Sequence, residues 1–155
     1  MVLYRPGAIT AAQLTAATGV AVKVFEPASQ PVSEPQSLPS PGVGIRHYAP
    51  HAGLLLIDPV LEEDLTHSLL RQSSLELDAG HRVGLMLPDG WAALPSSQVF
   101  AWGSWTDPTA LAHNLFTGLR DLDQRGVGVI LCPLPPTGGL YDAIRDRLRK
   151  AALPA

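Results

Sequence analysis

The chain has 155 residues, of which 46% are hydrophobic and 16% are charged, and its net charge is −3. This composition supplies enough apolar side chains for one buried core and excludes an intrinsically disordered chain. No uncharged apolar stretch approaches the roughly 18 residues that predict a membrane span, and the first six residues lack the apolar segment of a signal peptide.

We therefore expect a soluble protein of the cytoplasm with no membrane contact. The single cysteine, Cys132, excludes an internal disulfide and lies in an apolar run, where a buried thiol is the usual finding. One cluster of basic residues near the C-terminus is interleaved with acidic ones, and on a helix such charges pair with one another. We predict a solvated helix face rather than a nucleic-acid-binding patch. The charges concerned are Asp142, Arg145, Asp146, Arg147, Arg149 and Lys150.

Residues 1–26 do not resemble the beginning of a domain. Thr10 and Gln13 have the spacing of a capping box, which predicts a helix over 11–18 that ends at Gly19. The apolar residues of 20–25 then predict a strand. A lone helix and strand cannot bury their apolar faces, so they need a sheet from elsewhere. Without it, the strand would be an unpaired edge that favours self-association.

Residues 27–50 contain six prolines and four serines. Proline fixes φ and removes a backbone donor, so we expect an extended, semi-stiff arm rather than a helix or strand. The end of this arm, residues 40–50, is unlike a simple linker because it gathers two glycines, an arginine, a histidine and a tyrosine.

From residue 53 onward, short apolar runs alternate with helical patterns. The run 54–57 predicts a buried strand. Asp58 and Pro59 then suit the N-cap and first position of a helix that carries Leu61, Leu65 and Leu69 on one face.

The same alternation continues to the C-terminus. Residues 82–87 and 98–102 predict two further strands joined by a short crossover. Asp107 and Pro108 repeat the N-cap signal for a helix that ends at Gly126. The run 127–132 predicts a fourth strand, and Gly138-Gly139 precedes a last helix. The apolar faces of the two helices consist of Leu111, Leu115, Phe116, Leu119 and Leu122, and of Leu140, Ile144 and Leu148.

This order predicts an α/β fold, a Rossmann-like, mostly parallel sheet flanked by helices, with a Pro-rich N-terminal arm. The first strand is not followed by a glycine-rich fingerprint, and the sequence contains neither a P-loop nor a G-x-S-x-G motif. His47 and His51 have the spacing of a zinc pair, but Pro50 disfavours the helix that would align them, so we expect no metal site. Trp91, Trp102 and Trp105 are expected to pack in or beside the core.

Two short segments carry a family resemblance. Arg5-Pro6-Gly7-Ala8-Ile9-Thr10 resembles the end of the YrdC-like catalytic domain of the two-domain threonylcarbamoyl-AMP synthases. Ser40-Pro41-Gly42, followed by Arg46-His47-Tyr48-Ala49-Pro50, resembles the linker between the two domains of that family. Residues 107–152 are similar to the end of its C-terminal domain. The K-x-R and S-x-N motifs of the catalytic domain do not occur in this sequence.

The resemblance implies three regions. Residues 1–26 would be the end of a catalytic domain, 27–52 the interdomain linker or lid, and 53–155 the C-terminal accessory domain. The family makes threonylcarbamoyl-AMP from L-threonine, bicarbonate and ATP, releasing pyrophosphate, for threonylcarbamoyladenosine modification of tRNA. ATP and Mg²⁺ are thus implied for the full enzyme, and no cofactor is expected on this chain alone.

By this resemblance, Arg5 and Tyr48 would contact the nucleotide, and Arg46 and His47 are weaker candidates for lid contacts. The expected partner is a YrdC-like catalytic domain in the same chain or in another, so the chain alone is expected to be inactive. Fragment, split gene product and free-standing protein remain open. The alternative is a Rossmann-like module that binds a small ligand or a protein where its strands end. Its polar candidates are Asp58, Asp89, Ser104 and Thr137.

Overall fold

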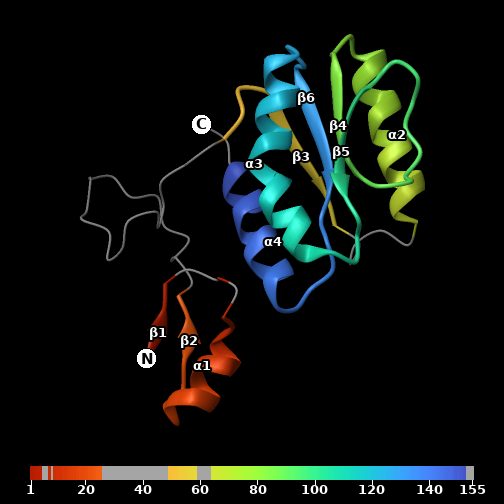
Figure 1. The fold of residues 1–155 in the computed structure, drawn as a ribbon. Coiled ribbons are helices and arrows are strands. Elements are labelled where there is room, and N and C mark those ends of the chain that lie inside the picture. Colours follow the sequence, from red (N-terminus) through yellow and green to blue (C-terminus); the bar gives the residue numbers. More distant parts are fainter. Residues whose placement is uncertain (5–6, 8, 26–48, 59–63, 153–155) are drawn as a thin grey trace, which may run out of the picture.

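Figure 1 shows the computed structural model of the protein, which describes residues 1–4, 7, 9–25, 49–58 and 64–152. Four strands form one parallel sheet, in the order β3-β6-β4-β5. The two inner strands are buried at every position, which explains their continuous apolar sequences. The predicted mostly parallel α/β sheet is therefore confirmed. The strands are β3 (Gly53–Ile57), β4 (Val83–Pro88), β5 (Gln98–Gly103) and β6 (Val129–Pro133).

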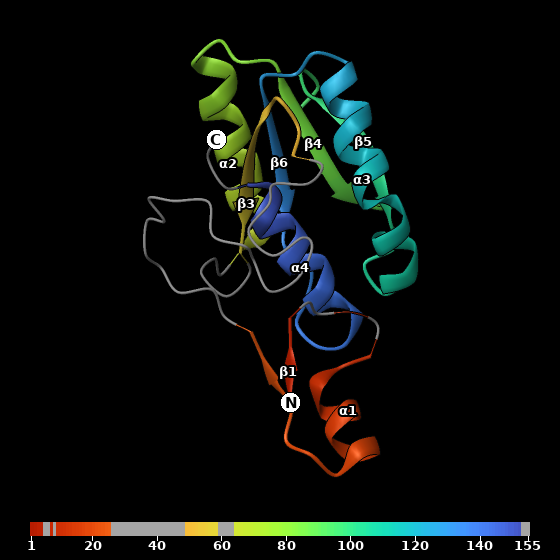
Figure 2. The same cartoon turned by 90° about the vertical axis from the view of Figure 1, so that its left-hand side faces the viewer.

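Helices cover both faces of this sheet. Helix α2 (Leu65–Asp78) lies on one face, while α3 (Pro108–Gln124) and α4 (Leu140–Ala151) lie on the other (Figures 1 and 2). Successive strand residues point to opposite faces, so the sheet divides its side chains between two cores. Leu85 and Leu131 face α2, whereas Met86 and Ile130 face α3 and α4. No helix in the described part of the chain is long and apolar enough to cross a membrane.

The connection between β4 and β5 is short for two parallel neighbours. Residues 89–97 cross the sheet without forming a helix. Instead, Trp91 and Ala93 pack against the core on the α2 side. The predicted packing role of the tryptophans is confirmed, because Trp102 is fully buried and Trp105 packs against the same core as Trp102.

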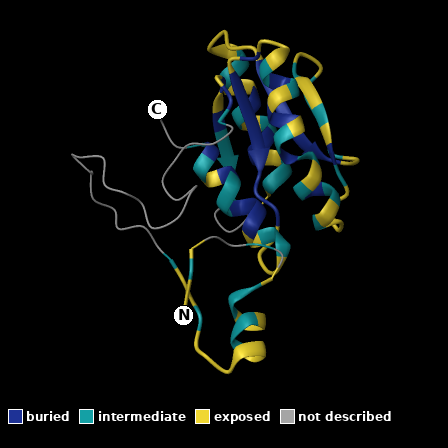
Figure 3. Ribbon diagram, turned by 60° about the vertical axis from the view of Figure 1, so that its left-hand side comes forward, coloured by how far each residue is buried: buried dark blue, intermediate teal, exposed yellow. Residues whose placement is uncertain are grey.

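Residues 1–25 form a separate small unit. It consists of β1 (Val2–Leu3), α1 (Ala11–Thr18) and β2 (Lys23–Val24). The capping box of Thr10 and Gln13 is present, and Gly19 ends the helix in the left-handed conformation. The strand predicted over 20–25 is shorter than expected, and it is not unpaired, because β2 pairs in parallel with β1. No residue of α1 is buried, and the described residues of this unit are coloured as intermediate or exposed in Figure 3.

One predicted helix start is wrong. Asp58 was expected to cap the helix after β3, but α2 begins at Leu65, and its N-cap is Asp64, whose carboxylate accepts a hydrogen bond from the His67 amide. The Asp58 carboxylate forms ion pairs with two arginines of α4, and residues 59–63 lie outside the described part of the chain. The equivalent prediction for Asp107 is confirmed, because its carboxylate accepts hydrogen bonds from two amides of the first turn of α3.

Candidate functional site

The residues that the sequence resemblance assigns to nucleotide and lid contacts are Arg5, Arg46, His47 and Tyr48. All four lie outside the described residues. The structure does describe the residues that follow the arm, from Ala49 onward, and the way they join the sheet. It also describes the edge of the sheet at which the alternative hypothesis places a ligand.

That edge is the one at which all four parallel strands end. Asp58 follows β3, Asp89 follows β4, Ser104 follows β5, and Thr137 lies four residues beyond β6. The ends of β4 and β5 are joined by a hydrogen bond from the Asp89 amide to the Gly103 carbonyl, at 3.0 Å. The Ser104 hydroxyl lies 3.0 Å from the hydroxyl of Thr106, within its own turn. The Ser104 side chain therefore serves its own turn, and the Asp89 backbone joins the ends of the two strands.

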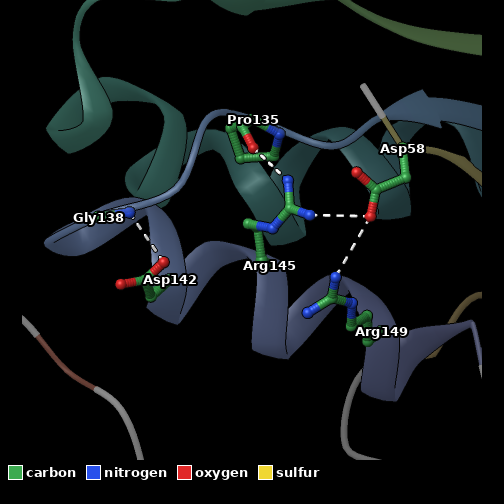
Figure 4. Close-up of polar contacts among 6 residues, drawn as sticks. All are labelled: Asp58, Pro135, Gly138, Asp142, Arg145 and Arg149. Atoms are coloured by element: carbon green, nitrogen blue, oxygen red, sulfur yellow. Dashed lines mark hydrogen bonds and ion pairs between the residues drawn. The ribbon is translucent and has the colours of Figure 1, made fainter. Parts of the chain in front are cut away.

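Asp58 belongs to a charged cluster with helix α4, which Figure 4 shows. The guanidinium of Arg145 donates to the Asp58 carboxylate at 2.8 Å and to the Pro135 carbonyl at 2.6 Å. Arg149, one turn later, lies 3.3 Å from the same Asp58 oxygen. The Arg145 side chain is only 5% exposed and that of Arg149 is 57% exposed.

This cluster corrects the prediction of a solvated helix face. Arg145 is buried, whereas Lys150 and Asp146 form the expected i,i+4 pair at 2.9 Å. Arg145 lies four residues after Tyr141 and three before Leu148, at the border of the apolar stripe of α4. That position was the one signal in the sequence for its burial. A buried guanidinium needs a carboxylate nearby, and Asp58 supplies it.

A cavity of about 290 Å³ lies beside the cluster. Its lining is charged, but the charges are already engaged with one another. Arg145 is paired with Asp58, and the carboxylate of Asp142 accepts a hydrogen bond from the Gly138 amide at the start of α4. The donors with which a small anion would pair, the Arg145 guanidinium and the Gly138 amide, are thus already bound to carboxylates of the protein. The lining residues are Thr137, Asp142, Arg145, Asp146 and Arg149.

A second polar cluster lies where the arm joins the domain. The carboxylate of Asp123, near the end of α3, accepts hydrogen bonds from His51 Nδ1 at 2.8 Å and from the Ala52 amide at 3.0 Å. Burial raises the pKa of Asp123, but the hydrogen bonds and the charge of His51 outweigh it and hold the pKa below its ordinary value. No local pattern predicts this contact, because 71 residues separate Ala52 from Asp123.

The described residues hold no group of three or more His, Cys, Asp or Glu side chains that could bind a metal ion. Cys132 is buried as predicted, and burial raises the pKa of its thiol. A buried thiol that is held protonated is a poor nucleophile.

Comparison with known proteins assigns the family. The family model described as the C-terminal domain of threonylcarbamoyl-AMP synthase matches residues 9–153. The threonylcarbamoyl-AMP synthase of Bacillus subtilis is 32% identical over 152 residues, which cover 97% of this chain and 41% of that protein. The enzyme of the same name from Pyrococcus abyssi is 33% identical over 118 residues, covering 73% of this chain and 32% of that protein. The chain therefore spans less than half the length of these curated relatives.

Solved structures agree. Two solved structures of P. abyssi Sua5 match 97% of this chain with a TM-score of 0.79 and 28% identity, and the matches cover 41% and 42% of those chains. One contains L-threonine, and in the other a histidine and the tyrosine after it are both replaced by alanine. The C-terminal Sua5 domain of Pyrococcus horikoshii matches with a TM-score of 0.53 and 26% identity, over 65% of this chain and 93% of that one. The chain belongs to the family of threonylcarbamoyl-AMP synthase C-terminal domains.

Proposed function

We propose that this chain is the linker and C-terminal accessory domain of a threonylcarbamoyl-AMP synthase, and that it works with a YrdC-like catalytic domain. That enzyme would join L-threonine, bicarbonate and ATP into threonylcarbamoyl-AMP and pyrophosphate, and the product would serve threonylcarbamoyladenosine modification of tRNA. ATP and Mg²⁺ would be held by the catalytic domain.

The observation that carries this proposal is the surface of residues 1–25. Large exposed hydrophobic residues are rare in the described chain, and six of the eight lie in this unit. Two two-residue strands and an eight-residue helix without a buried side chain cannot be stable alone. Such a unit requires a further apolar surface, which a YrdC-like domain would provide. The six residues are Met1, Val2, Tyr4, Ile9, Val20 and Val24.

The end of the catalytic domain, in residues 1–26, and the arm would both supply contacts to the substrates. Arg5 would bind the nucleotide by the bidentate pairing that suits phosphate, and Tyr48 would stack on it or donate a hydrogen bond. Arg46 and His47 would add lid contacts, and closure of the arm would exclude water from the reaction. In the P. abyssi variant, an adjacent histidine and tyrosine are both replaced by alanine. His47-Tyr48 is the one His-Tyr sequence in this chain, which supports the choice of this pair as candidates.

A pyrophosphate-release assay with ATP, L-threonine, bicarbonate and Mg²⁺ tests this function. The 155-residue chain alone should release no pyrophosphate, and it should stimulate a catalytic domain that lacks the arm. Tyr48→Ala should lower the stimulation at least about tenfold and leave a measurable remainder. Tyr141→Phe is the matched control, because the Tyr141 hydroxyl donates to the Trp105 carbonyl within the C-terminal domain. Activity of the chain alone, or full stimulation by Tyr48→Ala, would contradict the proposal.

The alternative, a module that binds a small ligand where the strands end, is favoured only by the charged cavity beside Arg149. The ion pair of Asp58 and Arg145 weakens this alternative, because a ligand would have to compete with a carboxylate already in place. A thermal-shift panel of nucleotides distinguishes the two functions: a rise in the melting temperature of the chain alone would support the module.

A further inference from the structure

Asp123 holds the point at which the arm enters the C-terminal half of the chain. Its two carboxylate oxygens bind two consecutive residues, Oδ2 to His51 Nδ1 and Oδ1 to the Ala52 amide. The adjoining residues are also fixed, because Pro50 and Ala52 are buried and the Gly53 amide donates to the Gly128 carbonyl at 3.0 Å.

The two hydrogen bonds differ in strength. The His51 side chain is 99% exposed and that of Asp123 is 19% exposed. Solvent therefore screens the charge of His51, and an exposed pair of this kind contributes little. The Ala52 amide has no such freedom, and its hydrogen bond to a largely buried carboxylate is charge-assisted. The contact with the Ala52 backbone thus dominates.

We propose that Asp123 is a positioning residue for the arm: it fixes the direction in which the chain leaves the domain toward Tyr48. This role rests on the proposed function. Tyr48 precedes Ala52 by four positions, so its Cα can lie no farther than roughly 14 Å from the Cα of Ala52. At so short a range, a change in backbone direction at Ala52 is passed on to the orientation of the residues next to it. Misorientation of a substrate-contacting group is costly to a reaction rate.

Amide hydrogen exchange measured by NMR tests the contact in the chain alone. Asp123→Ala should accelerate exchange of the Ala52 amide at least about tenfold, while amides in the centre of β3 remain protected. Asp123→Asn keeps an oxygen that can accept this hydrogen bond and should retain most of the protection. Asp121→Ala is the matched control, since it removes the same charge from α3 and Asp121 is paired with Arg125 instead. Unchanged exchange in Asp123→Ala would overturn the proposal.

The pyrophosphate assay with the catalytic domain tests the role. Asp123→Ala should lower kcat/KM by about tenfold, whereas Asp123→Asn and Asp121→Ala should stay within about twofold of the unmodified chain. If Asp123 acts through Tyr48, adding Asp123→Ala to Tyr48→Ala should cause little further loss.

The outcomes separate the two proposals. Full activity of Asp123→Ala despite faster Ala52 exchange would overturn the positioning role and leave the proposed function intact. Additive losses in the double variant would also overturn it, because they would show that Asp123 acts independently of the arm. If the unmodified chain gives no stimulation, the proposed function and this role are both overturned.

Discussion

A single carboxylate, Asp58, is shared by two arginines of α4 that lie one turn apart. The two pairs differ in their surroundings, because Arg145 is buried and Arg149 is more than half exposed. Truncating the buried arginine removes an ion pair that is shielded from solvent, whereas truncating the exposed arginine costs little. Replacing each arginine in turn therefore shows how burial changes the stability contributed by an ion pair with the same carboxylate.

We expect Arg145→Ala to lower the free energy of unfolding by about 3–5 kcal/mol, because it removes the buried partner of Asp58 and the donor to the Pro135 carbonyl. Arg149→Ala should cost less than about 1 kcal/mol. Urea unfolding followed by tryptophan fluorescence measures both. Equal losses in the two variants would show that burial does not determine the strength of this cluster.

The anchor at Asp123 should give stability that depends on pH. The pKa of this carboxyl in the folded chain lies below its ordinary value of 3.8, so the unfolded chain binds the proton more readily. The stabilising contribution is therefore complete above the ordinary pKa and is lost as the pH falls through the folded one. Unfolding of the unmodified chain and of Asp123→Asn, measured between about pH 7 and pH 3, should show a difference that shrinks with acidification. A difference that is constant with pH would contradict this.

At the scale of the elements, α3 lies so close to the sheet that one position has no room for a side chain. A Cβ at Gly118 would lie 2.7 Å from Cδ1 of Phe100 in β5 and 3.3 Å from Cε of Met86 in β4. Glycine lowers helix stability by roughly 1 kcal/mol relative to alanine, so propensity alone would favour a substitution. The close approach of the Phe100 ring explains why glycine is needed here.

Gly118→Ala should therefore destabilise the chain by about 1–2 kcal/mol, because the overpacking outweighs the gain in helix propensity. Gly118→Ala combined with Phe100→Leu should recover part of the loss, since the smaller side chain makes room. Thr117→Ala, at an exposed position of the same helix, is the control and should be neutral or slightly stabilising. A gain in stability from Gly118→Ala in thermal unfolding would show that the ring moves aside at no cost.

At the scale of the whole molecule, the two cores of the four-stranded sheet contain no residue of the first 25. Removal of residues 1–48 should therefore leave the urea midpoint unchanged within about 0.2 M, because none of the described residues among them belongs to either core. It should also remove any self-association, since the exposed apolar unit is deleted.

Light scattering at high concentration, on the 155-residue chain and on residues 49–155, tests this second effect. The longer chain should associate and the shorter one should stay monomeric. A lower urea midpoint for the shorter chain would show that the first 25 residues stabilise the sheet. A monomeric longer chain would show that its exposed apolar residues are too dispersed to bind one another.

Local patterns predicted local structure well. The capping box at Thr10, the N-cap and proline at Asp107 and Pro108, and the apolar run that became β4 each depend on neighbours within a few residues. The N-cap of α2 is Asp64, although the same logic predicts a helix start at Asp58. An arginine 87 residues away binds that carboxylate, and no window along the sequence can contain such a contact.

By itself, therefore, the sequence determined the alternation of strands and helices, the parallel sheet and the family resemblance of the segments that contain Arg5 and Tyr48. Only the tertiary structure decided the strand order β3-β6-β4-β5, the burial of Arg145 and the anchoring of Ala52 by Asp123. The physical reason is the distance along the chain over which each effect acts. Propensity, capping and periodicity act between residues close in the chain, whereas ion pairs and strand neighbours depend on which distant segments the fold brings together.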